Sequence, residues 1–137
     1  MNLVKRLLFG TGQLPIDLRA ALAADQPAII AEGLSGTVTL RHYRAPGKFV
    51  SFQKRAVAGA VAVTRQRLLV WTGRHKEVDV PLSDPLRDAV QVRVESPDRL
   101  LIVADVGRFN PATSGTIEIR LRTPDATRLA AAAGYAD

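Results

Sequence analysis

The chain has 137 residues, 47% of them hydrophobic, and its 19 Lys and Arg against 13 Asp and Glu give a formal net charge of +6. This length and apolar content suit one domain with its own core and exclude a disordered polyelectrolyte. The absence of cysteine excludes disulfide frameworks, thiol nucleophiles and thiolate metal sites, and it fits a reducing compartment. We therefore expect a folded cytoplasmic protein, either free or peripheral to a membrane.

The sequence contains no predicted transmembrane segment. Its longest strongly apolar uncharged run, residues 56–64, is less than half the length of roughly 20 residues that crosses a bilayer core. At the start, Lys5 and Arg6 precede an apolar stretch that is too short for a secretory signal. Residues 1–9 predict a short helix that packs on its own domain, with a helix on a membrane surface as the alternative.

The next predicted elements are a helix and a β-hairpin. Residues 15–25 begin with proline and place leucines at helical spacing, which predicts a second short helix. From Ala28 onward the apolar residues alternate with polar ones, as in a half-buried strand. The sequence Ala-Pro-Gly at 45–47 predicts a tight turn, because proline presets one dihedral angle and glycine supplies a positive one. Residues 48–54 then form the returning strand.

The rest of the chain predicts further strands and a final helix. Residues 56–64 and 67–72 read as a hairpin that ends at Gly73. Further apolar alternations predict strands over residues 78–82, 90–94 and 117–121, and the nearly all-apolar run 100–106 predicts a strand covered on both faces. Thr123 as cap, Pro124 at the first helical position and Gly134 after the last turn predict a C-terminal helix. Its apolar stripe consists of Ala126, Leu129, Ala130 and Ala133.

Counting gives eight or nine short strands and one C-terminal helix, which indicates a mainly β protein. The expected architecture is an antiparallel barrel, or two packed sheets, closed by the C-terminal helix and preceded by short N-terminal helices. We place an N-terminal helical extension at residues 1–26 and the barrel with its helix at residues 27–137.

Two stretches resemble a known family. Residues 59–71 (GAVAVTRQRLLVW) resemble a hairpin of bacterial pleckstrin-homology-like (PH-like) and GRAM-type domains, and residues 117–129 are similar to their last strand and capping helix. The resemblance covers roughly residues 27–134. It implies a seven-stranded barrel closed at one end by a helix, on a scaffold that binds phospholipid headgroups, peptides or its own copies. In PH families that bind phosphoinositides, basic residues surround the first hairpin, and Arg41, Arg44 and Lys48 resemble that placement.

Charge is the strongest functional signal. No acidic residue lies between Glu32 and Glu77, a segment rich in Lys and Arg. If two adjacent hairpins bring these cations together, the surface would attract phosphates. The predicted anion- or partner-binding residues are Arg41, Arg44, Lys48, Lys54, Arg65, Arg67, Arg74 and Lys76. The alternative is an ordinary solvated face, since Arg120 and Arg122 show that the chain also uses arginine as general surface.

The low aromatic content disfavours binding of single-stranded nucleic acid. Single-strand binders on β barrels combine a basic groove with several exposed rings, yet aromatics make up only 5% of this chain. Phe49 and Phe52 lie at an odd separation, so they cannot both face one side of a regular strand, and we expect at least one of them in the core. Trp71 is expected in the core or at the barrel rim.

Enzymatic chemistry has little support. The stretch 33–37 (GLSGT) lacks the second glycine of a nucleophile elbow, and Gly-Thr-Gly at 10–12 is too short for a phosphate loop. His42 and His75 have basic neighbours, which disfavours a metal, and His42 is expected in the core beside Val38 and Leu40. Asp105 would need a partner if its side chain pointed inward. We expect no catalysis, no metal and no cofactor.

The sequence therefore predicts a non-catalytic binding module. Its basic hairpin surface would contact anionic lipid headgroups or an acidic protein partner. The alternative is a structural protein that assembles with its own copies through strand edges, and single-stranded nucleic acid is the weaker third candidate.

Overall fold

The computed structural model describes residues 12–24, 29–73 and 75–134 of the chain. Within these residues, one antiparallel sheet of seven strands has the order β4-β3-β2-β1-β7-β6-β5. Its strands are β1 (Ile29–Ala45), β2 (Lys48–Val63), β3 (Arg67–Thr72), β4 (His75–Pro81), β5 (Val90–Ser96), β6 (Arg99–Asp105) and β7 (Ser114–Arg122). The helices are α2 (Ile16–Ala24) and α3 (Ala126–Ala132), with 3-10 turns η1 (Pro85–Ala89) and η2 (Val106–Arg108). The predicted helix over residues 1–9 lies outside the described residues.

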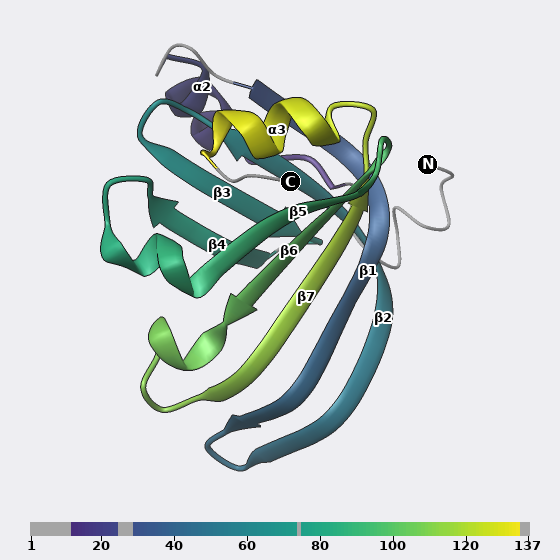
Figure 1. Ribbon diagram of the computed structural model, residues 1–137, viewed down its shortest axis with the longest axis vertical. Coiled ribbons are helices and arrows are strands. Elements are labelled where there is room, and N and C mark those ends of the chain that lie inside the picture. Colours follow the sequence, from purple (N-terminus) through teal and green to yellow (C-terminus); the bar gives the residue numbers. More distant parts are fainter. Residues whose placement is uncertain (1–11, 25–28, 74, 135–137) are drawn as a thin grey trace.

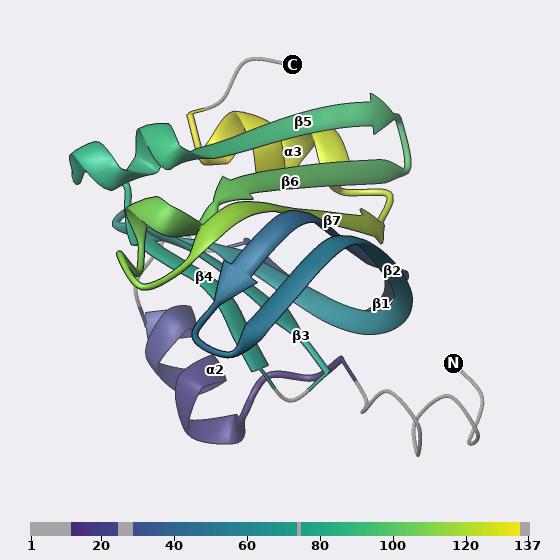
Figure 2. The same cartoon turned by 90° about the horizontal axis from the view of Figure 1, so that it is seen from below.

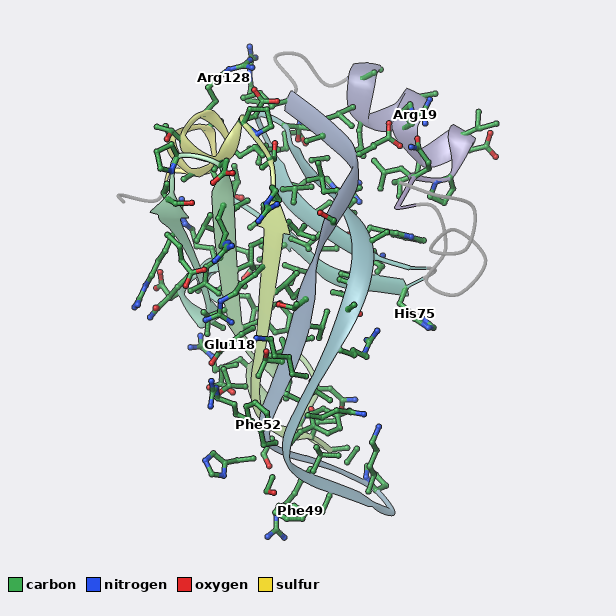
Figure 3. The ribbon with its side chains drawn as sticks, turned by 90° about the vertical axis from the view of Figure 1, so that its right-hand side faces the viewer. Arg19, Phe49, Phe52, His75, Glu118 and Arg128 are labelled. Carbon is green, nitrogen blue, oxygen red and sulfur yellow. The ribbon has the colours of Figure 1, made fainter. Side chains whose placement is uncertain are left out.

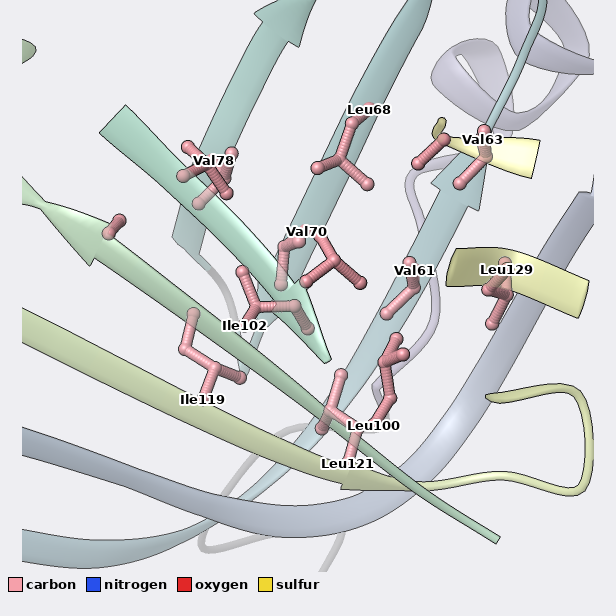
Figure 4. Packing of buried hydrophobic residues seen from close by; sticks show 14 of the residues in the cluster. Val61, Val63, Leu68, Val70, Val78, Leu100, Ile102, Ile119, Leu121 and Leu129 are labelled. Carbon is pink, nitrogen blue, oxygen red and sulfur yellow. The ribbon is translucent and has the colours of Figure 1, made fainter. Parts of the chain in front are cut away.

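The sheet curls into a half-barrel, with β4 and β5 as its two edges (Figures 1 and 2). Alternate residues of the strands point to the inner face and form one core, drawn in close view in Figure 4. Its fully buried members include Val61, Val70, Leu100, Ile102, Ile119 and Leu121. The prediction of a mainly β, barrel-like antiparallel fold with a C-terminal helix is confirmed.

The predicted number of eight or nine strands is wrong, because β1 and β2 are much longer than expected. The sequence predicts separate strands over residues 48–54 and 56–64, yet residues 48–63 form the continuous strand β2. Gly33, Ser35 and Gly36, which look like breaks in the sequence, lie inside β1. In its pairing with β2, β1 shifts register only between Ala31 and Leu34, so the glycines mark a bulge and a bend in the strand rather than its end.

Two glycines let the long strands bend around one core side chain. A Cβ atom on Gly36 would lie 1.8 Å from the carbonyl oxygen of Arg120 and 3.0 Å from Leu121 Cδ2. A Cβ atom on Gly59 would lie 2.7 Å from the carbonyl oxygen of Trp71 and 3.0 Å from the same Leu121 atom. The fully buried Leu121 therefore occupies space that side chains at Gly36 and Gly59 would take.

Both predicted hairpins are confirmed. Ala45 pairs with Lys48 around Pro46 and Gly47, and the φ of +73° at Gly47 is the positive value that a type II turn requires. In the second hairpin, the Thr64 hydroxyl oxygen accepts hydrogen bonds from the backbone N–H groups of Gln66 and Arg67, at 3.2 and 3.1 Å. Local turn chemistry therefore fixes both reversals.

Helix α3 covers one open end of the half-barrel (Figure 1). Its predicted stripe of Ala126, Leu129, Ala130 and Ala133 is buried. The helix begins at Ala126, later than predicted, because the Thr123 hydroxyl accepts from the N–H of Asp125 at 3.1 Å and stabilises a turn before the helix. The Arg87 guanidinium donates to the carbonyl oxygens of Ala133 and Gly134 at 3.2 and 3.1 Å, which ties the end of α3 to the β4–β5 connection.

Helix α2 packs on the outer face of the sheet. Leu14 and Leu22 contact a second, smaller cluster that includes Ala60, Ala62 and Leu69 from β2 and β3. Glu32 fixes this segment, since its carboxylate accepts from the N–H of Leu14 at 2.7 Å and pairs with Arg19 at 2.9 Å. This part of β2 and β3 is therefore buried on both faces.

We predict that Gly36→Ala destabilises the fold by about 2–3 kcal/mol, the cost of overpacking a well-filled core. The added methyl group has no room beside the Arg120 carbonyl. Urea unfolding followed by circular dichroism measures the effect. Gly47→Ala is the control, because its Cβ atom would meet nothing within 4 Å and only the positive φ costs about 1 kcal/mol. Equal losses from the two variants would contradict the close packing at Gly36.

Candidate functional site

The β1–β2 hairpin extends beyond the rest of the sheet. Pairing of β1 with β7 ends at Arg44 opposite Ser114, and pairing of β2 with β3 begins only at Gly59. The two strands continue together to the turn at Pro46 and Gly47, and we call residues 41–52, at and beyond the last β1–β7 pairs, the hairpin tip. Figures 1 and 3 show the tip at the end of the molecule opposite α3.

Three cations lie over three aromatic rings on the hairpin tip. The distances to the ring centroids are 5.2 Å for Arg41 over Phe52, 4.8 Å for Arg44 over Phe49 and 5.7 Å for Lys48 over Tyr43. These are cation–π contacts. Phe49 and Phe52 are 59% and 56% exposed, so the expectation that at least one of them is in the core is wrong. The core ends before the tip, and the alternation of the strand therefore leaves both rings in solvent.

A bulge redirects β1 at the base of the tip. His42 has a φ of +50°, and β1 shifts register against β7 between Arg41 and Arg44. Gly115 faces this bulge, where a Cβ atom would lie 2.5 Å from the His42 carbonyl oxygen. The prediction of a core imidazole at His42 is wrong, since the side chain is exposed. The strand has passed the end of the core at this residue.

A cavity of about 650 Å³ lies at the open end of the half-barrel, beside the hairpin tip. Its apolar lining comes from Leu40, Ala104, Val106, Phe109 and Ile117. Its charged lining consists of Lys48, Arg55, His75, Lys76 and Glu77. Tyr43, Asn110 and Thr113 complete the lining. The cavity therefore combines apolar walls with an excess of cationic side chains.

Hydrogen bonds position the single carboxylate of this lining. Glu77 accepts from the Thr72 hydroxyl at 2.6 Å and lies 3.9 Å from the Arg55 guanidinium. Lys76 pairs with Asp79 at 3.2 Å. Three cationic side chains, Lys48, Arg55 and Lys76, thus share the cavity lining with one carboxylate.

The predicted basic residues do not form one surface. Arg41, Arg44 and Lys48 lie together on the hairpin tip, and Lys76 joins Lys48 at the cavity. Lys54 lines a separate groove on the outer face. Arg65 and Arg67 lie at the far end of β2, where Arg67 pairs with Asp79 at 2.9 Å. Arg74 lies outside the described residues.

Sequence reasoning missed the part of the cavity that comes from distant strands. Arg55 lines the cavity, but nothing in the sequence distinguishes it from the exposed lysines and arginines around it. Phe109 and Thr113 come from the β6–β7 connection, far from the basic segment along the chain. Only the curl of the sheet brings that connection to the hairpin tip.

Two further residues have a clear local role. The Asp105 carboxylate points outward and accepts from the N–H of Gly107 at 3.2 Å, where it caps η2. Asp105 is exposed, so it does not need the buried partner that an inward-pointing side chain would require. Trp71 packs on the cluster beside α2 and donates its indole N–H to the Gly73 carbonyl at 3.2 Å, in agreement with a place at the rim of the core.

An ionic network crosses the outer face near the tip (Figure 3 labels Glu118). Glu118 pairs with Arg41 at 2.6 Å and with Arg120 at 3.0 Å, and Arg120 also pairs with Glu95 at 3.1 Å. Burial alone would raise the pKa of Glu118, but hydrogen bonds from Arg41 and Arg120 outweigh it and lower the pKa below 4.5. Burial would likewise lower the pKa of Arg120, which Glu118 and Glu95 raise instead. The network thus holds Arg41 and Arg120 in place.

We predict that Glu118 makes the fold sensitive to acid. Its lowered pKa means that its stabilising contribution is complete above the unfolded pKa near 4.5 and is lost as pH falls through the folded value. Glu118→Gln should cost about 1 kcal/mol at neutral pH and flatten the loss of stability below pH 4.5. Denaturant unfolding across this pH range tests both effects, with Asp88→Asn, at an exposed carboxylate, as control. An unchanged acid slope in Glu118→Gln would refute the assignment.

The described residues contain no group of three or more His, Asp or Glu side chains that could hold a metal ion. None of the described helices is long and apolar enough to cross a membrane. Comparison of the chain with protein-family models, with curated proteins and with solved structures finds no match. The functional argument therefore rests on the hairpin tip and the cavity beside it.

Proposed function

We propose that the protein is a non-catalytic binding module that docks on anionic membrane surfaces through its hairpin tip. The observation that carries this proposal is the set of three cation–aromatic pairs on a protruding, solvent-exposed hairpin. Aromatic rings favour the boundary between headgroups and acyl chains. Each nearby cation adds about 1 kcal/mol of attraction to an anionic leaflet.

The cavity supports the same proposal. Lys48 belongs both to the tip and to the cavity lining, so an anionic headgroup below the tip meets Lys48, Arg55 and Lys76 together. The resemblance of residues 27–134 to PH-like domains agrees with this interpretation, because it implies headgroup binding beside the first hairpin.

Single-stranded nucleic acid fits the hairpin tip less well than a membrane does. Phe49 and Phe52 are both exposed, which removes the sequence-based objection that one ring lies in the core. However, their odd separation places the two rings on opposite faces of the hairpin. One strand of bases cannot stack on both rings at once, whereas a hairpin that enters a membrane tip-first immerses both.

We predict that the Phe49→Ser/Phe52→Ser double variant and the Arg44→Glu/Lys48→Glu double variant both lose binding to anionic vesicles. The first removes the apolar contact and the second reverses the charge. Co-sedimentation with vesicles of phosphatidylcholine alone and of phosphatidylcholine with phosphatidylserine measures both losses. Binding of the unchanged chain should require phosphatidylserine and should weaken at physiological salt.

Arg93→Glu/Arg128→Glu is the control with the same change in charge. Both arginines are exposed, and Arg128 lies at the opposite end of the molecule from Phe49 (Figure 3). This control should still bind anionic vesicles. If the control and the tip variants lose binding equally, only net charge matters and the docking proposal fails. Binding of the unchanged chain to an acidic protein with no binding to vesicles would assign the tip to a protein partner.

Self-assembly remains the second candidate, and one observation favours it. The sheet ends in two edge strands, β4 and β5, whose outer backbone groups could pair with another copy. Analytical ultracentrifugation over a range of concentrations tests it. A monomer at all concentrations would exclude assembly, and an oligomer that does not dissociate on dilution would favour it over recognition.

A further inference from the structure

A groove on the outer face of the sheet lies outside the site described above. It has a volume of about 320 Å³ and is centred on β1 and β7, with Ser35, Gly36, Thr37 and Leu121 along its floor. Four cations complete its lining: Lys54, Arg99, Arg120 and Arg122. We propose that this groove binds the phosphate group of a small, soluble phosphate ester.

The hollow results from the lengths of neighbouring side chains. Thr37 lies opposite Ala56 on β2 and opposite Arg120 on β7. Ser35 and Thr37 point to the same face as Arg120 and Arg122, because alternate residues of a strand share a face. Short side chains on β1 are therefore bordered by long cationic ones on β2 and β7, which leaves room for a ligand above the hydroxyl groups.

The cations are poorly neutralised on one side of this groove. Arg99 on β6 lies directly opposite Arg122 on β7, and like charges in this position destabilise a sheet. Asp98 approaches Arg122 only to 4.0 Å. Within the described part of the chain, Lys54 and Arg99 have no ion pair. A phosphate between these side chains would remove their repulsion.

Arg120 lines one side of the groove in a fixed position. Its Nε and Nη1 atoms donate to Glu95 and Glu118 at 3.1 and 3.0 Å, so the side chain is held before any ligand arrives. Guanidinium groups bind phosphate oxygens in pairs through parallel N–H donors. Arg99 and Arg122 bring two further guanidinium groups to the lining from β6 and β7, and the Ser35 and Thr37 hydroxyls are additional donors.

The distance from the hairpin tip indicates a soluble source for the phosphate. From Gly36 to Ala45, β1 spans about 30 Å at 3.3 Å per residue. Charges attract an anionic surface only within a Debye length of about 10 Å. A membrane that holds the tip therefore leaves the groove in solution. This choice of source rests on the proposed function, whereas the phosphate site itself does not.

Titration of the full chain with inorganic pyrophosphate tests the site, by calorimetry and by two-dimensional NMR of the backbone amides. We expect saturable binding that shifts the amides of Gly36 and Thr37. The Arg99→Ser/Arg122→Ser variant should weaken it roughly tenfold or more, since it removes two charged donors. This variant should unfold at the same temperature as the unchanged chain or higher, because it also removes a repulsion.

Arg108→Ser/Arg128→Ser is the matched control, with the same loss of charge outside the groove, and it should bind pyrophosphate as the unchanged chain does. Equal weakening in both variants, or no binding by the unchanged chain, would overturn the proposal. The Phe49→Ser/Phe52→Ser variant should no longer bind vesicles but should still bind pyrophosphate. Either proposal can therefore be refuted without the other. If Arg99 and Arg122 are needed for phosphatidic acid vesicles while free pyrophosphate does not bind, the soluble source is wrong.

Discussion

The close approach of β1, β2 and β7 around Leu121 is the constraint on which the rest of the structure depends. A leucine side chain fills the space that Gly36 and Gly59 leave open, and the sheet can bend there without a break in pairing. Because the bend occurs inside β1 and β2, the same two strands join the β3–β4 half to the β5–β7 half and then continue past the core. The packing of Leu121 against Gly36 and Gly59 thus accounts both for the curl of the sheet around the core and for the hairpin that extends past it.

That arrangement separates the cationic side chains by their position along the strands. Near α3 the inner face is filled by leucine, isoleucine and valine, and cations are confined to the outer face, where carboxylates pair with several of them. At the other end, the core stops before the strands do, so both faces of the hairpin tip are open to solvent and carry Phe49, Phe52 and three cations. The strands of the sheet therefore present the exposed aromatic and cationic tip directly.

The ionic network on the outer face connects the two candidate binding regions. Glu118 pairs with Arg41, which stacks on Phe52 at the tip, and with Arg120, which lines the outer groove. The same carboxylate thus orients one cation for each region. The pKa of Glu118 is lowered by these hydrogen bonds, so acid would loosen both regions together by removing their shared counter-charge.

The sequence by itself determined the features that depend on neighbouring residues. The two hairpin turns, the alternation that separates inner from outer residues, the alanine stripe of α3 and the absence of acidic residues between Glu32 and Glu77 all follow from local dihedral preferences, period and composition. Only the tertiary structure decided where strands end and which charges meet. Gly36 looks like a strand break until Leu121 packs against it, and at least one of Phe49 and Phe52 is expected in the core until the core is seen to stop short of both. Arg55 joins Phe109 at the cavity, and Lys54 joins Arg99 and Arg122 in the groove, because curl and register bring together residues that sequence separation keeps apart.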